Sequence, residues 1–391
     1  MPFKRLTLLW LTGAVALSAA VAQGAHGKAL PTGESSLSLE LSDQTATQSS
    51  GKMPTRSPVN IKLFYPTQGV DPDLPWIMMM NGANCYGQDY TYLLRQLASK
   101  GYLTVAPTQF HPAPPMQDGK DFFKDQADHC DKDSFVIITA SLVNDVHNLL
   151  KTLSSSDSQR LLPIPQIQLD AMDALKNVDS DSIVLVAHSA GGVTAVDMLT
   201  GKCEEKGEAE QVCGNYTTIT DRKGRNALKG AVAFEGYGAS GVQIPDGMFL
   251  TYMAGQYNDQ AEEKFNTTKG DCIQYVELAA GNHYAITDWN PDTAPHQKAP
   301  CAANISHDDP NFKTTESEQE ERIDFIASYT DAVVRATVLN DQTAASYLLH
   351  DVPNSHLVRK AKVSSKCVVA SLHDESKQIA HKPEQQSVTQ V

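Results

Sequence analysis

The sequence predicts an α/β fold with a mainly parallel central sheet and helices on both faces. Short apolar runs of strand length alternate along the chain with segments whose apolar residues recur at helical spacing. Several apolar runs are continuous, which is typical of strands buried on both faces. The chain has 391 residues, of which 41% are hydrophobic and 20% charged. These values suit one large folded domain and exclude a mostly disordered or fibrous protein.

The N-terminal segment, residues 1–22, contains the three parts of a secretory signal. Two basic residues precede an apolar run over residues 6–17, and the small residues Ala20 and Ala22 form a cleavage site. The apolar run is shorter than the ~20 residues that a membrane span needs. We therefore expect cleavage after Ala22, no stable membrane span, and a protein that is secreted or stays in the lumen of the secretory pathway.

The expected flexible N-terminal segment, residues 23–53, is rich in Ser, Thr, Gly and Gln. The alternation starts near residue 54. Apolar runs that are stopped by proline, glycine or polar residues predict strands over residues 59–65, 76–80, 102–106 and 183–186. Apolar residues at helical spacing predict helices over residues 90–100, 135–152 and 193–199.

The second half of the expected domain begins with a small insertion after the helix at 193–199. This insertion, about residues 200–228, is polar and carries two cysteines. Apolar runs then predict strands over residues 229–234, 248–253 and 273–278, and helical spacing dominates residues 317–349. Residues 350–391 are rich in Ser, Lys, His and Gln, so we expect a disordered tail and a domain over residues 54–349.

The charge balance is acidic. The chain has 32 Lys and Arg against 46 Asp and Glu, a formal net charge of −14. Such a surplus repels phosphate backbones, so we expect no nucleic-acid partner.

Seven cysteines fit an oxidising compartment, and none lies in a CxxC pair. Loop closure favours three disulfides: Cys203–Cys213 and Cys272–Cys301 close short loops, and Cys85–Cys130 joins loops that leave neighbouring strands. Cys367 then stays unpaired. Six cysteines allow 15 connectivities, so other pairings stay open.

Three Asn-x-Ser/Thr sequons follow the expected signal peptide. They begin at Asn215, Asn266 and Asn304. Together with secretion they predict a glycoprotein.

The strongest chemical motif surrounds Ser189, which stands between an expected strand and an expected helix. The small residues Ala187 and Gly191 lie two positions before and after it, as a sharp strand-to-helix turn requires. Such a turn exposes the serine hydroxyl at a helix N-terminus, where backbone N–H groups favour an oxyanion. Ser189 is therefore the predicted nucleophile, and the Ala190 N–H is one predicted oxyanion donor.

A nucleophilic serine needs a base, and the base needs an orienting acid. The strand at 248–253 runs into a loop that ends at Asp259, and the strand at 273–278 runs into a loop that contains His283. We expect Asp259 as the acid and His283 as the base. Glu235, directly after another strand, is the alternative acid.

The second oxyanion donor should come from the loop after the strand at 76–80. Gly82 lets the backbone approach a bound acyl group closely, and Ala83 N–H is the predicted donor. His188, beside the nucleophile, is interpreted as a packing residue of the turn.

At these residues the chain resembles the α/β-hydrolase superfamily over about residues 54–349. The stretch from Asn81 to Pro107 and the turn from Ala187 to Gly192 look like those shared by chlorophyllases, dienelactone-hydrolase-like proteins and bacterial polyester hydrolases. The resemblance implies an α/β-hydrolase fold and serine esterase chemistry through an acyl-enzyme, without a cofactor. Residue 190 is Ala here, where chlorophyllases usually have Arg and polyester hydrolases Met.

The predicted function is hydrolysis of carboxylic esters, with a small-molecule or lipid-like ester as substrate. No metal is expected, because the adjacent residues of the acidic and histidine cluster at 128–131 cannot converge on one ion from a single strand or helix. Two alternatives stay open. In the first alternative the chain is a non-catalytic binding protein of the same fold. In the second it is an enzyme of that fold with thioesterase or amidase chemistry.

Overall fold

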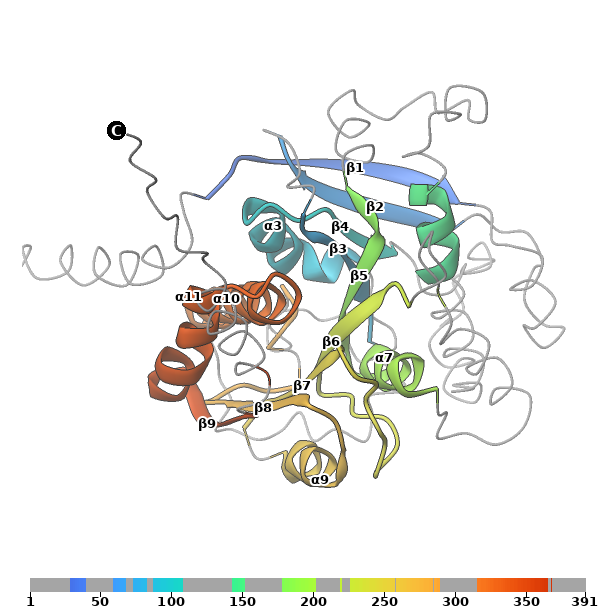
Figure 1. The fold of residues 1–391 in the computed structure, drawn as a ribbon. Coiled ribbons are helices and arrows are strands. Elements are labelled where there is room, and N and C mark those ends of the chain that lie inside the picture. Colours follow the sequence, from blue (N-terminus) through green and yellow to red (C-terminus); the bar gives the residue numbers. More distant parts are fainter. Residues whose placement is uncertain are drawn as a thin grey trace, which may run out of the picture.

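The structure is a computed structural model, drawn as a ribbon in Figure 1. It describes residues 29–39, 59–67, 73–82, 87–107, 143–151, 178–201, 219, 226–256, 258–283, 285–288, 315–364 and 367. The expected signal peptide, most of the insertion at 200–228 and the whole tail after residue 367 lie outside these residues.

Strands and helices alternate through the central part of the chain, as the apolar pattern predicts. The strands are β1 (Thr32–Leu39), β2 (Val59–Pro66), β3 (Pro75–Met80), β4 (Thr104–Pro107), β5 (Asp179–His188), β6 (Leu228–Phe234), β7 (Phe249–Ala254), β8 (Cys272–Leu278) and β9 (Val358–Val363). The helical elements are η1 (Gly87–Tyr90), α3 (Thr91–Ser99), α7 (Ala190–Thr200), α9 (Asp259–Thr267), α10 (Glu316–Val338), α11 (Gln342–Ser346), η5 (Tyr347–Asp351) and η6 (Val352–Asn354). A further helix covers residues 143–151.

Within the described residues, one mixed sheet of nine strands runs in the order β1-β2-β4-β3-β5-β6-β7-β8-β9. The strands from β4 to β8 in this order are parallel, while β2, β1 and β9 join antiparallel at the two edges. From β3 the chain moves to β4 on one side, and from β4 it returns past β3 to β5 on the other side. The strand order therefore reverses direction between β3 and β5. Ligands of open α/β sheets bind at such a reversal, outside the carboxyl ends of the strands.

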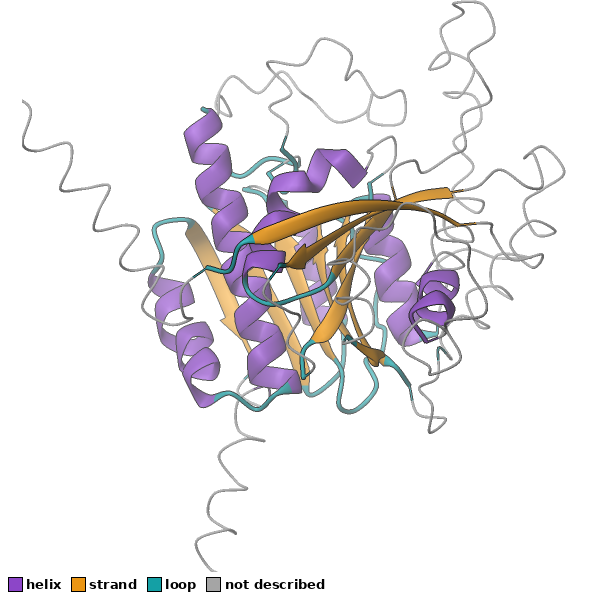
Figure 2. Ribbon diagram, turned by 90° about the horizontal axis from the view of Figure 1, so that it is seen from above, coloured by secondary structure: helices purple, strands orange, loops and turns teal. Residues whose placement is uncertain are grey.

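The sheet separates two apolar layers, and helices cover both of its faces (Figures 1 and 2). Strand β3 shows how the sequence builds this arrangement. Trp76, Met78 and Met80 belong to one core cluster, which also contains buried residues of α7 and the helix at 143–151. Ile77 and Met79 belong to the other cluster, which contains buried residues of α3 and α10. Successive side chains of a strand point to opposite faces, so this continuous apolar run fills both layers.

The two edge strands are absent from the expected elements. β1 lies in the segment expected to be flexible, and β9 lies in the expected tail. Among the residues that the structure describes, each pairs on one side only: β1 with β2, and β9 with β8. An edge strand tolerates polar side chains on both faces, so TGESSLSL and VRKAKV carry little apolar signal.

The expected helical region at 317–349 is divided at residues 339–341. Asn340 has a φ of +57°, and the Asp341 side chain accepts hydrogen bonds from the N–H groups of Thr343 and Ala344. A left-handed residue ends one helix and an N-cap starts the next, so α10 and α11 are separate.

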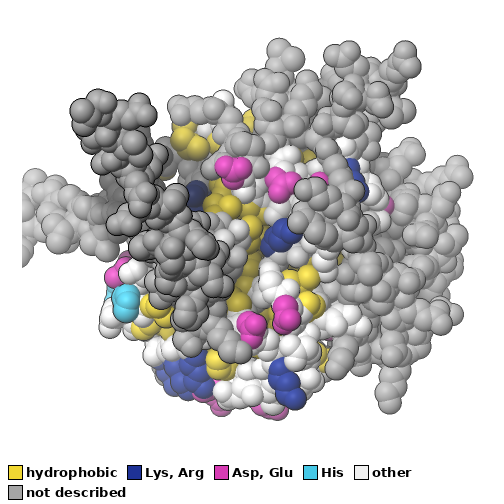
Figure 3. Space-filling view, in the orientation of Figure 1, with side chains coloured by type: hydrophobic (Ala, Val, Ile, Leu, Met, Phe, Trp, Pro, Cys, Tyr) yellow, Lys and Arg dark blue, Asp and Glu magenta, His cyan; other side chains and the backbone are white. Residues whose placement is uncertain are grey.

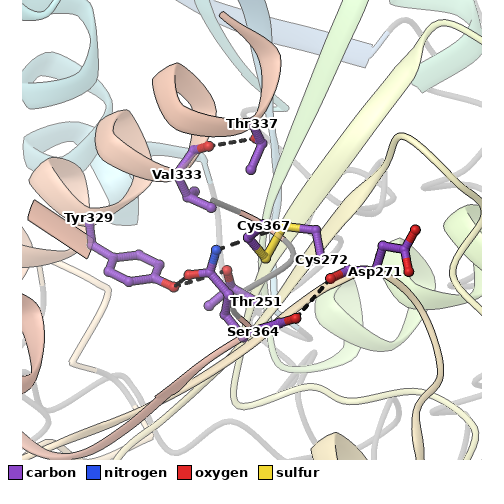
Figure 4. The surroundings of a disulfide bond; sticks show 9 residues. Thr251, Asp271, Cys272, Tyr329, Val333, Thr337, Ser364 and Cys367 are labelled. Carbon is purple, nitrogen blue, oxygen red and sulfur yellow. Dashed lines mark hydrogen bonds between the residues drawn. A yellow bond between two sulfur atoms is a disulfide. The ribbon is translucent and has the colours of Figure 1, made fainter. Parts of the chain in front are cut away.

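The disulfide prediction for Cys272 is wrong. Cys272, the first residue of β8, is bonded to Cys367, which the sequence left unpaired (Figure 4). The two Cα atoms are 4.4 Å apart although 95 residues separate them in the sequence. Loop length favoured the nearer Cys301, but antiparallel pairing of β9 with β8 returns the chain to the start of β8. Cys85, Cys130, Cys203, Cys213 and Cys301 lie outside the described residues.

Basic side chains gather at the lower part of the face in Figure 3, near β9 and α9. On β9, Lys360 and Lys362 pair with Glu262 of α9, and Arg359 pairs with Glu277 of β8. Charges along an edge strand discourage pairing with another chain, so this patch protects the sheet edge.

Asn266 is the one glycosylation candidate among the described residues. It is exposed near the end of α9, and its side-chain oxygen accepts a hydrogen bond from Lys362 Nζ. Asn215 and Asn304 lie outside the described residues. Within the described part of the chain, no helix is long and apolar enough to cross a membrane.

Candidate active site

The predicted site residues lie in loops that leave the carboxyl ends of neighbouring parallel strands. Ser189 follows β5, Glu235 follows β6, and His283 follows β8. The register of the parallel ladder places the ends of β5, β6, β7 and β8 side by side at one sheet edge. Residues far apart in the sequence therefore meet at this edge, next to the reversal between β3 and β5.

Ser189 occupies a sharp turn between β5 and α7. Its φ of +52° and ψ of −123° lie in a region that residues with a side chain rarely adopt. The turn is held from both sides: Ser189 N–H donates to the Phe234 carbonyl at 2.9 Å, and Gly192 N–H donates to the Ser189 carbonyl at 2.8 Å. Such strain persists only where surrounding contacts impose it, and it is concentrated at functional sites.

Small residues around the turn are a steric requirement. A Cβ on Gly191 would collide with the main-chain oxygens of Met80 and Asn81. A Cβ on Gly236, in the loop after β6, would collide with the carbonyl oxygen of Ser189. The requirement at Gly191 matches the sequence prediction, whereas Gly236 has no signal in the local motif because its contact is tertiary.

The loop after β3 passes directly beside the turn. A Cβ built on Gly82 would lie 3.2 Å from the Ser189 Cβ, so the backbone of this loop approaches the serine closely. Ala83, the predicted oxyanion donor, lies outside the described residues. Ala190 is the first residue of α7. The first N–H groups of a helix have no partner within the helix, so Ala190 N–H can donate to a bound anion.

The structure brings the alternative acid to the predicted base. Glu235 Oε2 lies 3.8 Å from His283 Nδ1, and the two side chains are only 6% and 17% exposed. Glu235 also accepts hydrogen bonds from Gly255 N–H and from the Asn258 side-chain amide. These donors, both from the loop after β7, hold the carboxylate facing the histidine ring.

The structure does not bring Asp259 to His283, so the expected choice of acid is not supported. Asp259 is exposed and begins α9, one residue after Asn258. The Asn258 side chain accepts from Gln260 N–H and caps this helix. A capped helix fixes the direction of its first turn, and here the first helical residue faces solvent.

Tyr237 adds a further polar group beside the acid. Burial raises the pKa of the Tyr237 phenol well above its usual range, and the neighbouring Glu235 carboxylate raises it further. The phenol therefore stays protonated at all ordinary pH values. Tyr237 therefore places a neutral hydroxyl next to Glu235.

Sequence reasoning missed Asn258, Gly255 and Tyr90 as parts of the site. Asn258 carried a readable signal, since Asn before an acidic residue is a common helix start. Its second role, donating to Glu235, depends on packing between two loops. Tyr90 begins the segment whose apolar spacing predicts a helix, and that spacing gives no sign of a site residue. Its hydroxyl nevertheless hydrogen-bonds with the His188 ring at 2.8 Å.

No known family model matches this chain, and no curated protein sequence matches it either. Among the described residues, His, Cys, Asp and Glu side chains form no group of three that could hold a metal ion.

Proposed function

We propose that the chain is an α/β-hydrolase-fold enzyme that cleaves carboxylic esters, with Ser189 as nucleophile, His283 as base and Glu235 as acid. The observation that carries the proposal is the joint arrangement of a strained serine turn and a carboxylate–histidine pair at one sheet edge. A strained serine alone occurs in other turns. Here the carboxylate follows β6 and the histidine follows β8, at the same sheet edge as the serine. A buried carboxylate that faces a histidine is the arrangement that activates a serine.

The chemistry follows from these positions. Ser189 Oγ attacks the acyl carbon while His283 Nε2 takes the hydroxyl proton, and the carbonyl electron pair moves onto the oxygen. Glu235 faces Nδ1, so it selects the tautomer with the proton on Nδ1 and stabilises the imidazolium that forms. The amides of Ala190 and of the loop after β3, for which Ala83 is the candidate, donate to the oxyanion.

The tetrahedral intermediate then collapses. The ester C–O bond breaks, and the leaving alcohol takes the proton from His283 Nε2. Water repeats the sequence on the acyl-enzyme: His283 takes its proton, the acyl–serine bond breaks, and Ser189 regains its hydrogen. The products are a carboxylic acid and an alcohol, and no cofactor is needed to balance the reaction.

The proposed setting is the secretory pathway or the outside of the cell. The tripartite segment at residues 1–22 supports entry into that pathway. The Cys272–Cys367 bond fits an oxidising compartment. The proposed substrate is a small-molecule or lipid-like ester.

The test is covalent labelling of the mature protein with a fluorophosphonate, followed by hydrolysis of acyl esters of graded chain length. We expect labelling at Ser189, and we expect Ser189→Ala to abolish labelling and reduce turnover by roughly 10⁶-fold while the fold is retained. Thioesters and amides in the same panel distinguish the related chemistries. An unlabelled wild-type protein, or undiminished turnover in Ser189→Ala, would overturn the proposal.

A further inference from the structure

A chain of hydrogen bonds links the two sides of the candidate site through residues that have no assigned role. Gly82 N–H, in the loop after β3, donates to the Tyr90 hydroxyl at 2.9 Å. The same hydroxyl lies 2.8 Å from His188 Nδ1, and His188 Nε2 lies 2.7 Å from the main-chain oxygen of His283. Gly82 and His283 lie in the loops after β3 and β8, Tyr90 ends η1, and His188 is the last residue of β5, so the chain of bonds joins three separate segments at the carboxyl edge of the sheet.

Because the full burial of His188 favours its neutral form, counting donors and acceptors gives the direction of these bonds. A carbonyl oxygen only accepts, so His188 Nε2 carries a proton and donates to the His283 carbonyl. Tyr90 accepts from Gly82 N–H and has its own hydrogen to donate, so it donates to His188 Nδ1. His188 is then the neutral Nε2–H tautomer, and every bond in the chain has one donor and one acceptor.

The surroundings of His188 agree with this neutral tautomer. The side chain is fully buried, and its ring lies 4.8 Å, centroid to centroid, from the His283 ring. Burial, and then the neighbouring His283, lower the pKa of His188 well below its usual range. A second histidine charge beside the base would oppose the imidazolium that forms there, so a neutral His188 suits the reaction.

We propose that His188 and Tyr90 are positioning residues that couple the loop after β3 to the catalytic base. The proposal rests on the proposed function and deepens it. His188 fixes the main chain of His283, while Glu235 faces the Nδ1 atom of its ring. Tyr90 holds Gly82, whose loop approaches Ser189. The Tyr90 hydroxyl and the His188 imidazole thus set the distance between the loop after β3, which supplies the candidate oxyanion donor, and the loop that carries His283.

Two amide substitutions separate the two ends of the His188 ring. The amide of His188→Gln can reach the position of Nε2 and donate to the His283 carbonyl. The shorter His188→Asn can occupy the position of Nδ1 and meet Tyr90, but it cannot reach the His283 carbonyl. Both are neutral and polar, so they differ mainly in which hydrogen bond survives. His356→Asn is the matched control, because His356 is 77% exposed at the surface.

The measurement is kcat per active site, titrated with a fluorophosphonate, together with KM. We expect His188→Asn to lower kcat by about 10- to 100-fold at unchanged KM, the scale produced by a misplaced catalytic group. His188→Gln is expected to retain most of the turnover. Titration corrects for any misfolded fraction, so a purely structural role would leave kcat per titrated site unchanged.

A second variant tests the other end of the chain. Tyr90→Phe removes the hydroxyl that meets both Gly82 and His188, and we expect a fall in kcat. Because both residues act through the same network, the double variant with His188→Asn should lose less than the product of the two single losses. Independent, multiplicative losses would overturn the shared network.

The outcomes separate this proposal from the proposed function. If the wild-type protein is not labelled at Ser189, the serine-hydrolase function is overturned and the positioning role falls with it. If the wild-type protein is labelled and hydrolyses esters, but His188→Asn keeps its full kcat per titrated site, only the positioning role is overturned. Equal losses of kcat in His188→Asn and His188→Gln would also overturn the positioning role, because the hydrogen bond to the His283 carbonyl would then not affect turnover.

Discussion

The two halves of the candidate site are built in different ways. In the nucleophile half, β5, Ser189 and α7 are consecutive, so one short stretch of sequence specifies the strand, the turn and the helix. In the acid–base half, the loops after β6, β7 and β8 each supply part of the arrangement. A contiguous motif can be recognised from residue spacing alone, whereas a site shared by three loops depends on how they pack.

The two candidate acids show the consequence. Glu235 and Asp259 follow neighbouring parallel strands, and both have suitable side chains. Glu235, with a φ of +54°, is held facing His283, while the cap at Asn258 makes Asp259 the exposed first residue of a helix. Backbone conformation and capping, rather than order along the chain, decide which acid meets the base.

Exchanging each candidate acid for its amide tests directly which of the two acts on His283. Glu235→Gln cannot stabilise the histidine with the proton on Nδ1, so we expect turnover of a soluble ester to fall by roughly 10⁴-fold. Asp259→Asn changes an exposed side chain, so turnover is expected to stay at the wild-type level. Steady-state kinetics on both purified variants measure the difference.

The opposite result assigns the acid to Asp259. A large loss in Asp259→Asn, with activity kept in Glu235→Gln, would mean that the first residue of α9 supplies the acid. Circular dichroism of both variants excludes unfolding as the cause of either loss.

Removing the Cys272–Cys367 bond is expected to destabilise the acid–base half. The bond joins the start of β8, the strand that leads to His283, to the chain beyond β9. Replacing both cysteines with serine should lower the free energy of unfolding by about 2–4 kcal/mol, as measured by denaturant titration.

Peptide mapping under non-reducing conditions provides the direct check on that bond. A linked pair of peptides containing Cys272 and Cys367 is expected in the wild-type protein and in Cys301→Ser. A peptide that links Cys272 to Cys301 would contradict the pairing and restore the choice based on loop length.

Substitutions of Asn258 are expected to have milder effects. Asn258 donates to Glu235 and caps the helix on which Asp259 is exposed. Asn258→Ser keeps a capping oxygen for α9 but loses the amide donor to Glu235. Asn258→Ala loses both. We expect both variants to lose turnover, and only Asn258→Ala to lose about 1 kcal/mol of stability. Equal stability of the two variants would contradict the capping role.

Much of the central sheet could be predicted from the sequence, and the edges could not. The runs that became β3, β5, β6, β7 and β8 are buried on both faces, which favours apolar residues along most of their length. β1 and β9 lie at the edges, where one side is unpaired and polar side chains are tolerated, so their composition resembles that of a loop. The partner of Cys272 was missed for the same reason, since β9 brings Cys367 to it.

Sequence alone was enough to predict the parts of the protein in which neighbours along the chain are also neighbours in space. These parts include the alternation of buried strands and helices and the turn at Ser189, because steric limits on a strand–turn–helix act over a few residues. The tertiary structure alone decided that Glu235 faces His283, that Cys272 bonds to Cys367, and that His188 links two loops. Each of these contacts joins residues from separate loops or strands, so it exists only after the sheet has placed them at one edge or in adjacent strands.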